Sequence, residues 1–143
     1  MGQFYQIKCT KCDFEGSFSE GTTMKMVDES FTVACDACCN IETRNYTYPE
    51  DRPLRPAPAT GWWGRKKRLQ EIDDHYAEVS ARWNAELDKR REEALGQPCS
   101  MCGEKVHRVN FGDPFTNPIP VDIGCPSCKE FGCMTVCLQG MYD

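Results

Sequence analysis

Cys9-Thr10-Lys11-Cys12 and, after 22 further residues, Cys35-Asp36-Ala37-Cys38 form the stretch that decides how this chain is expected to fold. The same arrangement recurs 90 positions later, with Cys-Ser-Met-Cys at 99–102 and Cys-Pro-Ser-Cys at 125–128. Each Cys-x-x-Cys turn is termed a knuckle below. Four knuckles in two equally spaced sets indicate two metal sites, each made of four thiolates.

The eight knuckle cysteines are the predicted metal ligands. They are Cys9, Cys12, Cys35, Cys38, Cys99, Cys102, Cys125 and Cys128. Pairing consecutive knuckles closes the shorter loops and explains the equal spacing, so we expect one site in each half of the chain. The alternative is an interleaved arrangement, in which knuckles from opposite halves share a site.

Composition limits the class of protein. Each half that carries cysteines is too small for an apolar core alone to offset the entropy of folding, so metal is expected to be part of the fold. The eleven cysteines are an odd number and no secretion signal is evident, so a disulfide scaffold is not expected. We expect a cytoplasmic protein with no membrane partner. The net charge of −5 argues against nucleic-acid binding by the whole surface.

A long helix is predicted over residues 65–96, because helix formers dominate there and neither Pro nor Gly occurs before Gly96. Its apolar residues recur at spacings of three and four and therefore share one face. They are Leu69, Ile72, Tyr76, Val79, Trp83 and Leu87. Gly96 is expected to be the left-handed residue just past the helix end, with Pro98 following. The proline-rich residues 49–64 before the helix predict a semi-rigid linker.

The last two knuckles resemble those of the zinc-ribbon family, since Gly103 follows the second cysteine of one and Pro126 follows the first cysteine of the other. The first two knuckles match the family in spacing. The resemblance implies two closed structural Zn²⁺ sites and no single function. We therefore expect an α+β fold with two small antiparallel-β ribbons. The predicted domains are ribbon 1 at 1–48, the linker at 49–64, the long amphipathic helix at 65–96 and ribbon 2 at 97–143.

Other metal chemistry uses some of the same residues. Rubredoxin-like iron would take four thiolates too, so the metal stays open between zinc and iron, with zinc expected. Pro98 and Cys99 match part of the zinc-deaminase pattern, but His75 and Glu78 are spaced one residue too widely to supply the rest. A thioredoxin-type site would need a βαβ context. Catalysis is therefore not expected.

Three cysteines lie outside the predicted ligand set. Cys39 is an alternative to Cys38 as a ligand in a wider turn. Cys133 and Cys137 share one face of a predicted final strand, where we expect them to be buried apolar residues. A redox pair is the alternative for these two.

The expected function is that of an adaptor or assembly module that binds a protein partner or a second copy of itself. The candidate interaction surface is formed by Tyr76, Val79, Trp83 and Leu87 on the helix. A candidate basic patch lies at the helix start, where the helix dipole disfavours positive charge. It comprises Arg65, Lys66, Lys67 and Arg68. The alternatives are a nucleic-acid or transcription-associated factor and a metal-handling or redox protein.

Overall fold

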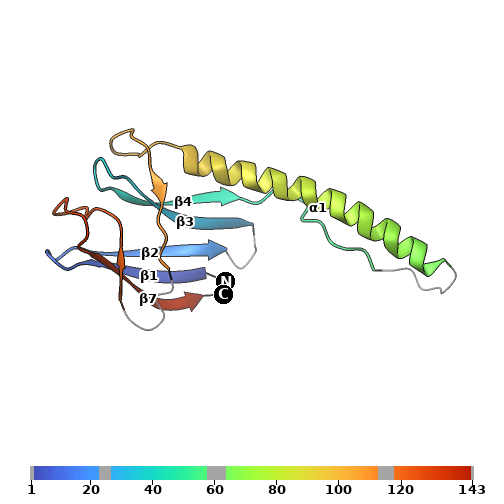
Figure 1. Ribbon diagram of the computed structural model, residues 1–143, viewed down its shortest axis with the longest axis horizontal. Coiled ribbons are helices and arrows are strands. Elements are labelled where there is room, and N and C mark those ends of the chain that lie inside the picture. Colours follow the sequence, from blue (N-terminus) through green and yellow to red (C-terminus); the bar gives the residue numbers. More distant parts are fainter. Residues whose placement is uncertain (1, 23–26, 58–63, 113–117, 143) are drawn as a thin grey trace. The chain divides into compact units, whose positions relative to one another are not determined.

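The computed structural model describes residues 2–22, 27–57, 64–112 and 118–142, which form seven strands and one long helix (Figure 1). The chain is mixed α and β, as predicted. In order, the elements are β1 Gly2–Cys9, β2 Glu15–Thr22, β3 Asp28–Ala34, β4 Ile41–Thr47, α1 Arg65–Gly96, β5 His107–Arg108, β6 Ile119–Val121 and β7 Met134–Tyr142. The searched residues include no helix that is both long enough and apolar enough to cross a membrane.

The described strands belong to one antiparallel sheet that joins both ends of the chain. Its order is β4-β3-β2-β1-β7-β6, and β5 pairs with β3 beside this path. Strand β1 pairs along its length with β2 on one side and with β7 on the other. In Figure 1 the blue N-terminal strand accordingly lies next to the red C-terminal strand.

Strand β3 changes partner along its length. Near its start it pairs with β2, through Ser30 opposite Gly21. Near its end it pairs with β5, through Ala34 opposite His107. Because β3 leads into one knuckle and β5 follows another, this change brings knuckles from the two halves of the chain together.

The prediction of a separate ribbon in each half is therefore wrong. The chain forms two units by its contacts, one made of Met1–Tyr48 with Arg91–Asp143 and the other of Pro49–Arg90. The first unit holds the sheet, all four knuckles and the end of α1. Equal spacing of the knuckles indicates hairpins of similar length, but it does not determine which strands pair. Here strands that are far apart in sequence pair with one another. Residues 58–63 of the predicted linker lie outside the described residues.

The core of the first unit is shared by both ends of the chain. Tyr5, Ile7 and Cys9 alternate toward one face of β1, as a half-buried strand requires. The ring of Tyr5 stacks on Phe111, with their centroids 4.5 Å apart. The remaining buried members of this cluster are Ala34, Val109, Val121, Ile123, Cys125, Cys133, Met134 and Val136. Neither end could bury these side chains alone.

In the second unit the linker runs along the helix. Trp83 Nε1 donates to the carbonyl oxygen of Pro49 at 3.3 Å, and Arg55 forms an ion pair with Asp73 at 2.6 Å. The linker therefore passes antiparallel to α1. It covers part of a helix that has only one buried residue, Ala94 near its C-terminal end, in the described structure.

Candidate metal centres

All four knuckles share one backbone hydrogen bond. In each, the N–H of the first cysteine donates to the carbonyl oxygen five residues later, over 2.8 to 3.0 Å. The pairs are Cys9 with Phe14, Cys35 with Asn40, Cys99 with Glu104 and Cys125 with Glu130. This bond closes the turn, and backbone amides inside it face the sulfur. The N–H of Lys11, for example, lies 3.4 Å from Cys9 Sγ.

In three knuckles the residue after the second cysteine has a left-handed backbone. It is Cys39 with φ 57°, Gly103 with φ 76° and Lys129 with φ 60°. Glycine adopts this conformation without steric cost, which explains why Gly103 marks its knuckle so clearly in the sequence. Cys39 turns its Sγ toward the carbonyl oxygen of Lys129, at 3.9 Å, and Cys38 is the residue that joins the other ligands.

The structure gathers the eight predicted cysteines into two groups of four. Site 1 comprises Cys9, Cys12, Cys125 and Cys128, and site 2 comprises Cys35, Cys38, Cys99 and Cys102. Within each group all four sulfurs lie within 4.8 Å of one another. The predicted consecutive pairing is wrong, and the interleaved alternative is the observed one. Each site takes one knuckle from each half because β1 pairs with β7 and β3 pairs with β5.

The sulfur spacings suit a tetrahedral ion. The Sγ atoms of Cys9 and Cys128 are 3.8 Å apart in site 1, and those of Cys38 and Cys99 are 3.6 Å apart in site 2. An ion with metal–sulfur bonds of about 2.3 Å sets its sulfurs about 3.8 Å apart. The two groups can therefore hold two metal ions, one each. Four thiolates suit zinc and iron alike.

One thiol in each site ionises readily. Burial opposes ionisation of Cys9, but the hydrogen bond from the Lys11 N–H and the contact with the Cys133 side chain outweigh it and lower the pKa of Cys9 to about 6. Hydrogen bonds from backbone N–H groups of its own knuckle lower the pKa of Cys99 to about 6. Since the thiolate is the form that binds metal, each site has one ligand prepared for an incoming cation.

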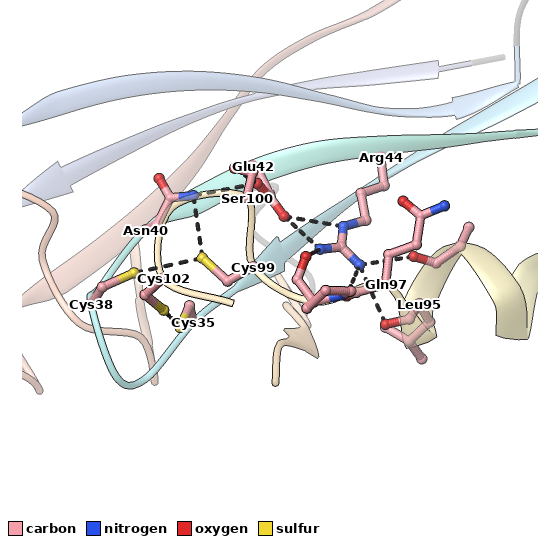
Figure 2. Close-up of polar contacts among 12 residues, drawn as sticks. Cys35, Cys38, Asn40, Glu42, Arg44, Leu95, Gln97, Cys99, Ser100 and Cys102 are labelled. Carbon is pink, nitrogen blue, oxygen red and sulfur yellow. Dashed lines mark hydrogen bonds and ion pairs between the residues drawn. The ribbon is translucent and has the colours of Figure 1, made fainter. Parts of the chain in front are cut away.

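A chain of polar contacts leads away from site 2 (Figure 2). Asn40 Nδ2 lies 3.7 Å from Cys99 Sγ and donates to a carboxylate oxygen of Glu42 at 3.3 Å. The same Glu42 oxygen accepts the hydroxyl of Ser100 at 2.5 Å, and the other accepts from Arg44 Nη2 at 2.5 Å. The strand β4 thus connects a metal ligand to a buried guanidinium group.

That guanidinium group holds the C-terminal end of α1. Arg44, only 8% exposed, donates to the carbonyl oxygens of Ala94 at 2.9 Å, Gln97 at 2.5 Å and Pro98 at 2.9 Å. The prediction of a left-handed Gly96 just past the helix end is wrong. Gly96 is the last residue of the helix and is not among the residues with positive φ. A side chain from β4 satisfies the end of the helix instead, and Figure 2 shows it among those carbonyl groups.

The other predicted surfaces lie on the part of α1 in the second unit. The four candidate interaction residues, Tyr76, Val79, Trp83 and Leu87, are half-buried. The four residues of the candidate basic patch, Arg65, Lys66, Lys67 and Arg68, are exposed, and Lys67 lies 3.9 Å from Glu71. No side chain of either set belongs to one of the two cysteine groups found in the described residues.

Cys133 is buried, as predicted, but its position beside site 1 was not predicted. It was expected on one face of a strand with Cys137, but β7 begins one residue after it and its Sγ lies 3.4 Å from Cys9 Sγ. The one sequence signal for this position is that Cys133 follows Cys128 by five residues. That spacing is not a recognised pattern of metal ligands. The two histidines lie outside both cysteine groups, and His107 is 3.6 Å from Asp36.

No family model, no curated protein and no solved structure matches this chain. The resemblance to zinc ribbons is therefore carried by the knuckles alone.

Proposed function

We propose that this protein is a non-enzymatic, zinc-stapled binding module that serves as an adaptor or assembly platform. The observation that carries the proposal is the interleaved pairing of the knuckles. Each ion would link a knuckle before residue 48 to one after residue 98. The two metals would therefore hold together the points where the chain leaves the first unit and returns to it, with residues 49–90 between them.

The donor set supports a structural role for the metal. Four thiolates complete a tetrahedral shell, whereas catalytic zinc keeps one position open for water or substrate. Both sites have four cysteines at suitable spacing. Such closed sites contribute to folding energy directly. Zinc is the proposed metal because it is the usual occupant of closed tetrathiolate sites in small β units.

The helix surface supports a binding role. Its apolar stripe is only half-buried by the described residues, although the linker passes over part of it. An apolar helix face left partly open is a common docking surface for a partner protein. We assign this role to Tyr76, Val79, Trp83 and Leu87. The exposed basic patch beside it would attract an acidic partner surface.

Metal analysis tests the structural part of the proposal. Native mass spectrometry of the purified chain is expected to show two zinc ions, and a strong chelator is expected to unfold the first unit because the ions are part of its fold. One ion per chain, bound iron, or a fold that survives full removal of metal would contradict the structural zinc assignment.

Isolation of the native complex tests the binding part. The tagged variant Val79→Glu/Trp83→Glu is expected to lose the partner that copurifies with the wild-type chain. Ala81→Glu/Ala85→Glu, on exposed positions of the same helix, is expected to keep it. Equal retention by both variants would remove the stripe from the proposal. A partner that proves to be nucleic acid, with affinity that falls steeply with salt, would favour the alternative function through the basic patch.

A further inference from the structure

The two metal sites differ in what lies beside their ligands. Site 1 has a fifth sulfur, since Cys133 Sγ lies 3.4 Å from Cys9 Sγ. At site 2 the corresponding neighbour is Asn40, whose amide Nδ2 lies 3.7 Å from Cys99 Sγ. A thiol becomes a metal ligand when it loses its proton, whereas an amide nitrogen remains a hydrogen-bond donor.

The backbone of Cys133 is hydrogen-bonded to the knuckle that begins at Cys9. Its carbonyl oxygen accepts the N–H of Thr10 at 2.8 Å and the Thr10 hydroxyl at 3.2 Å. Its side chain is buried, with 2% of the residue exposed, and its Sγ lies 3.2 Å from the carbonyl oxygen of Glu130. Cys133 is therefore held beside site 1 by its backbone, and the carbonyl oxygen of Glu130 accepts a hydrogen bond from its thiol.

Cys133 Sγ is close enough to Cys9 Sγ to replace it as a ligand. The sulfurs of a tetrahedral thiolate site are about 3.8 Å apart, so Cys133 Sγ is as close to Cys9 as a true ligand would be. Rotation about a single side-chain torsion moves a cysteine sulfur by roughly 3 Å between staggered positions. A side-chain rotation is therefore of the size needed to bring Cys133 Sγ toward the coordination position of Cys9.

We propose that Cys133 is a reserve ligand of site 1, which takes the coordination position of Cys9 when the Cys9 thiolate is absent. This proposal rests on the proposed metal-binding function. The bound ion is a borderline-soft divalent cation such as Zn²⁺. When residue 9 offers no thiolate, the metal lacks its bond to that residue. A bond between the metal and Cys133 Sγ forms in its place, and the Cys133 thiol proton passes to water. Beside Cys99 of site 2 the neighbour is the Asn40 amide, and Cys39 Sγ is directed toward the carbonyl oxygen of Lys129. Cys9 therefore has a sulfur beside it to replace it, and Cys99 does not.

Matched alanine variants test the proposal. Cys9→Ala and Cys99→Ala each remove the first cysteine of a knuckle from a buried position, one from each site. The full chain is loaded with ¹¹³Cd²⁺ or Co²⁺, which report the number of coordinating sulfurs by chemical shift or by charge-transfer absorption. Cys9→Ala is expected to keep two ions in four-sulfur sites, and Cys99→Ala is expected to lose one such site.

The double variant Cys9→Ala/Cys133→Ala identifies the replacing sulfur. It is expected to lose the four-sulfur signal of site 1 and to bind that ion at least about 100-fold more weakly, beyond the cost of losing an outer-shell partner. If Cys9→Ala loses its site as Cys99→Ala does, or if adding Cys133→Ala changes nothing, the reserve-ligand proposal is overturned.

Two controls keep the result interpretable. Cys9→Ser and Cys99→Ser preserve side-chain size with a hydroxyl in place of the thiol, so the same comparison holds if the alanine variants do not fold. The wild-type chain must bind two ions in four-sulfur sites. A wild-type chain that does not do so contradicts the proposed function itself, whereas an intact wild type with a failed Cys9→Ala variant contradicts only the role of Cys133.

Discussion

Gly124 brings the chain beside site 1 into contact with a residue beside site 2. It precedes Cys125 of site 1 and lies against Cys39, which follows Cys38 of site 2. A Cβ atom at position 124 would lie 2.3 Å from Cys39 Sγ and 3.0 Å from a ring carbon of Phe131. Because Cys39 is held in a left-handed turn and is buried, it has little room to move away. Glycine is therefore required here by packing.

We predict that Gly124→Ala lowers the free energy of unfolding by about 1 to 3 kcal/mol, the usual cost of overpacking. Gly140→Ala is the matched control, because a Cβ there has no neighbour within 4 Å and is expected to change stability by less than about 0.5 kcal/mol. Urea unfolding of the metal-saturated proteins measures both changes.

The second variant in this test removes the clashing side chain. Gly124→Ala/Cys39→Gly is expected to recover most of the lost stability, since Cys39→Gly removes the sulfur and also suits the left-handed backbone. Additive effects of the two substitutions would show that the close contact is not the cause.

At the scale of the elements, β4 holds the C-terminal end of α1. Arg44 donates to the carbonyl groups beyond the last turn, and Arg91 Nε donates to the hydroxyl of Tyr46 at 3.1 Å. The guanidinium carbon of Arg91 also lies 5.4 Å from the centre of the Tyr46 ring. The last four carbonyl groups of any helix lack partners within it. Here Arg44 Nη1 donates to two of them, those of Ala94 at 2.9 Å and Leu95 at 3.4 Å.

We predict that Arg44→Met destabilises the protein by about 3 kcal/mol, because it leaves buried carbonyl groups and Glu42 without their charged partner. Arg44→Lys is expected to recover less than half, since an ammonium group cannot contact several carbonyl groups in the fork geometry of a guanidinium. Arg82→Met, which removes an exposed ion pair with Glu78, is the control and is expected to cost less than about 0.5 kcal/mol.

Chemical denaturation with metal bound measures these three variants, and amide hydrogen exchange locates the change. Faster exchange is expected at the C-terminal end of α1 in Arg44→Met alone. Equal costs for Arg44→Met and Arg82→Met would contradict the capping role of Arg44.

At the scale of the whole molecule, the interleaved sites and the β1–β7 pairing join the ends of the chain. Residues 49–90 leave the first unit after β4 and return through α1 to the knuckle at Cys99. The polar contacts from Cys99 through Glu42 to Arg44 place the returning helix end and a metal ligand in one network. Metal at site 2 is therefore expected to stabilise the end of the helix as well as the sheet.

A nicked chain tests this connectivity. We predict that a protein cut at a protease site inserted between the exposed residues Pro56 and Ala57 stays one particle with two metal ions, because each ion binds both fragments. Addition of a chelator is expected to separate the fragments. Native mass spectrometry before and after chelation provides the measurement.

Two results of the nicked-chain experiment would contradict this prediction. Two fragments that separate without chelator, each with one ion, would show that consecutive knuckles pair. Fragments that remain together after complete metal removal would show that strand pairing alone is sufficient and that the ions add little.

Much of the local structure could be predicted from the sequence. The helix was predicted to within one residue of its observed bounds, Arg65–Gly96, because the absence of Pro and Gly before Gly96 and the spacing of its apolar residues are local properties. The eight cysteines of the two groups were predicted for the same reason, since a Cys-x-x-Cys turn forms within six residues. The strands that lead into the knuckles followed from alternation of apolar residues.

The tertiary structure decided what depends on contacts between distant residues. The partner of each knuckle and the place of Cys133 beside Cys9 arise from strands that pair across more than fifty residues. The cap that Arg44 provides to α1 is a contact between a strand and a helix that are equally distant in sequence. Loop-closure entropy favours consecutive pairing only weakly, since it grows with the logarithm of loop length. Burial of one core shared by both ends outweighs that preference. The sequence by itself thus determined the candidate metal ligands and the helix, while the long-range pairing of β1 with β7 and of β3 with β5 determined which of these cysteines meet.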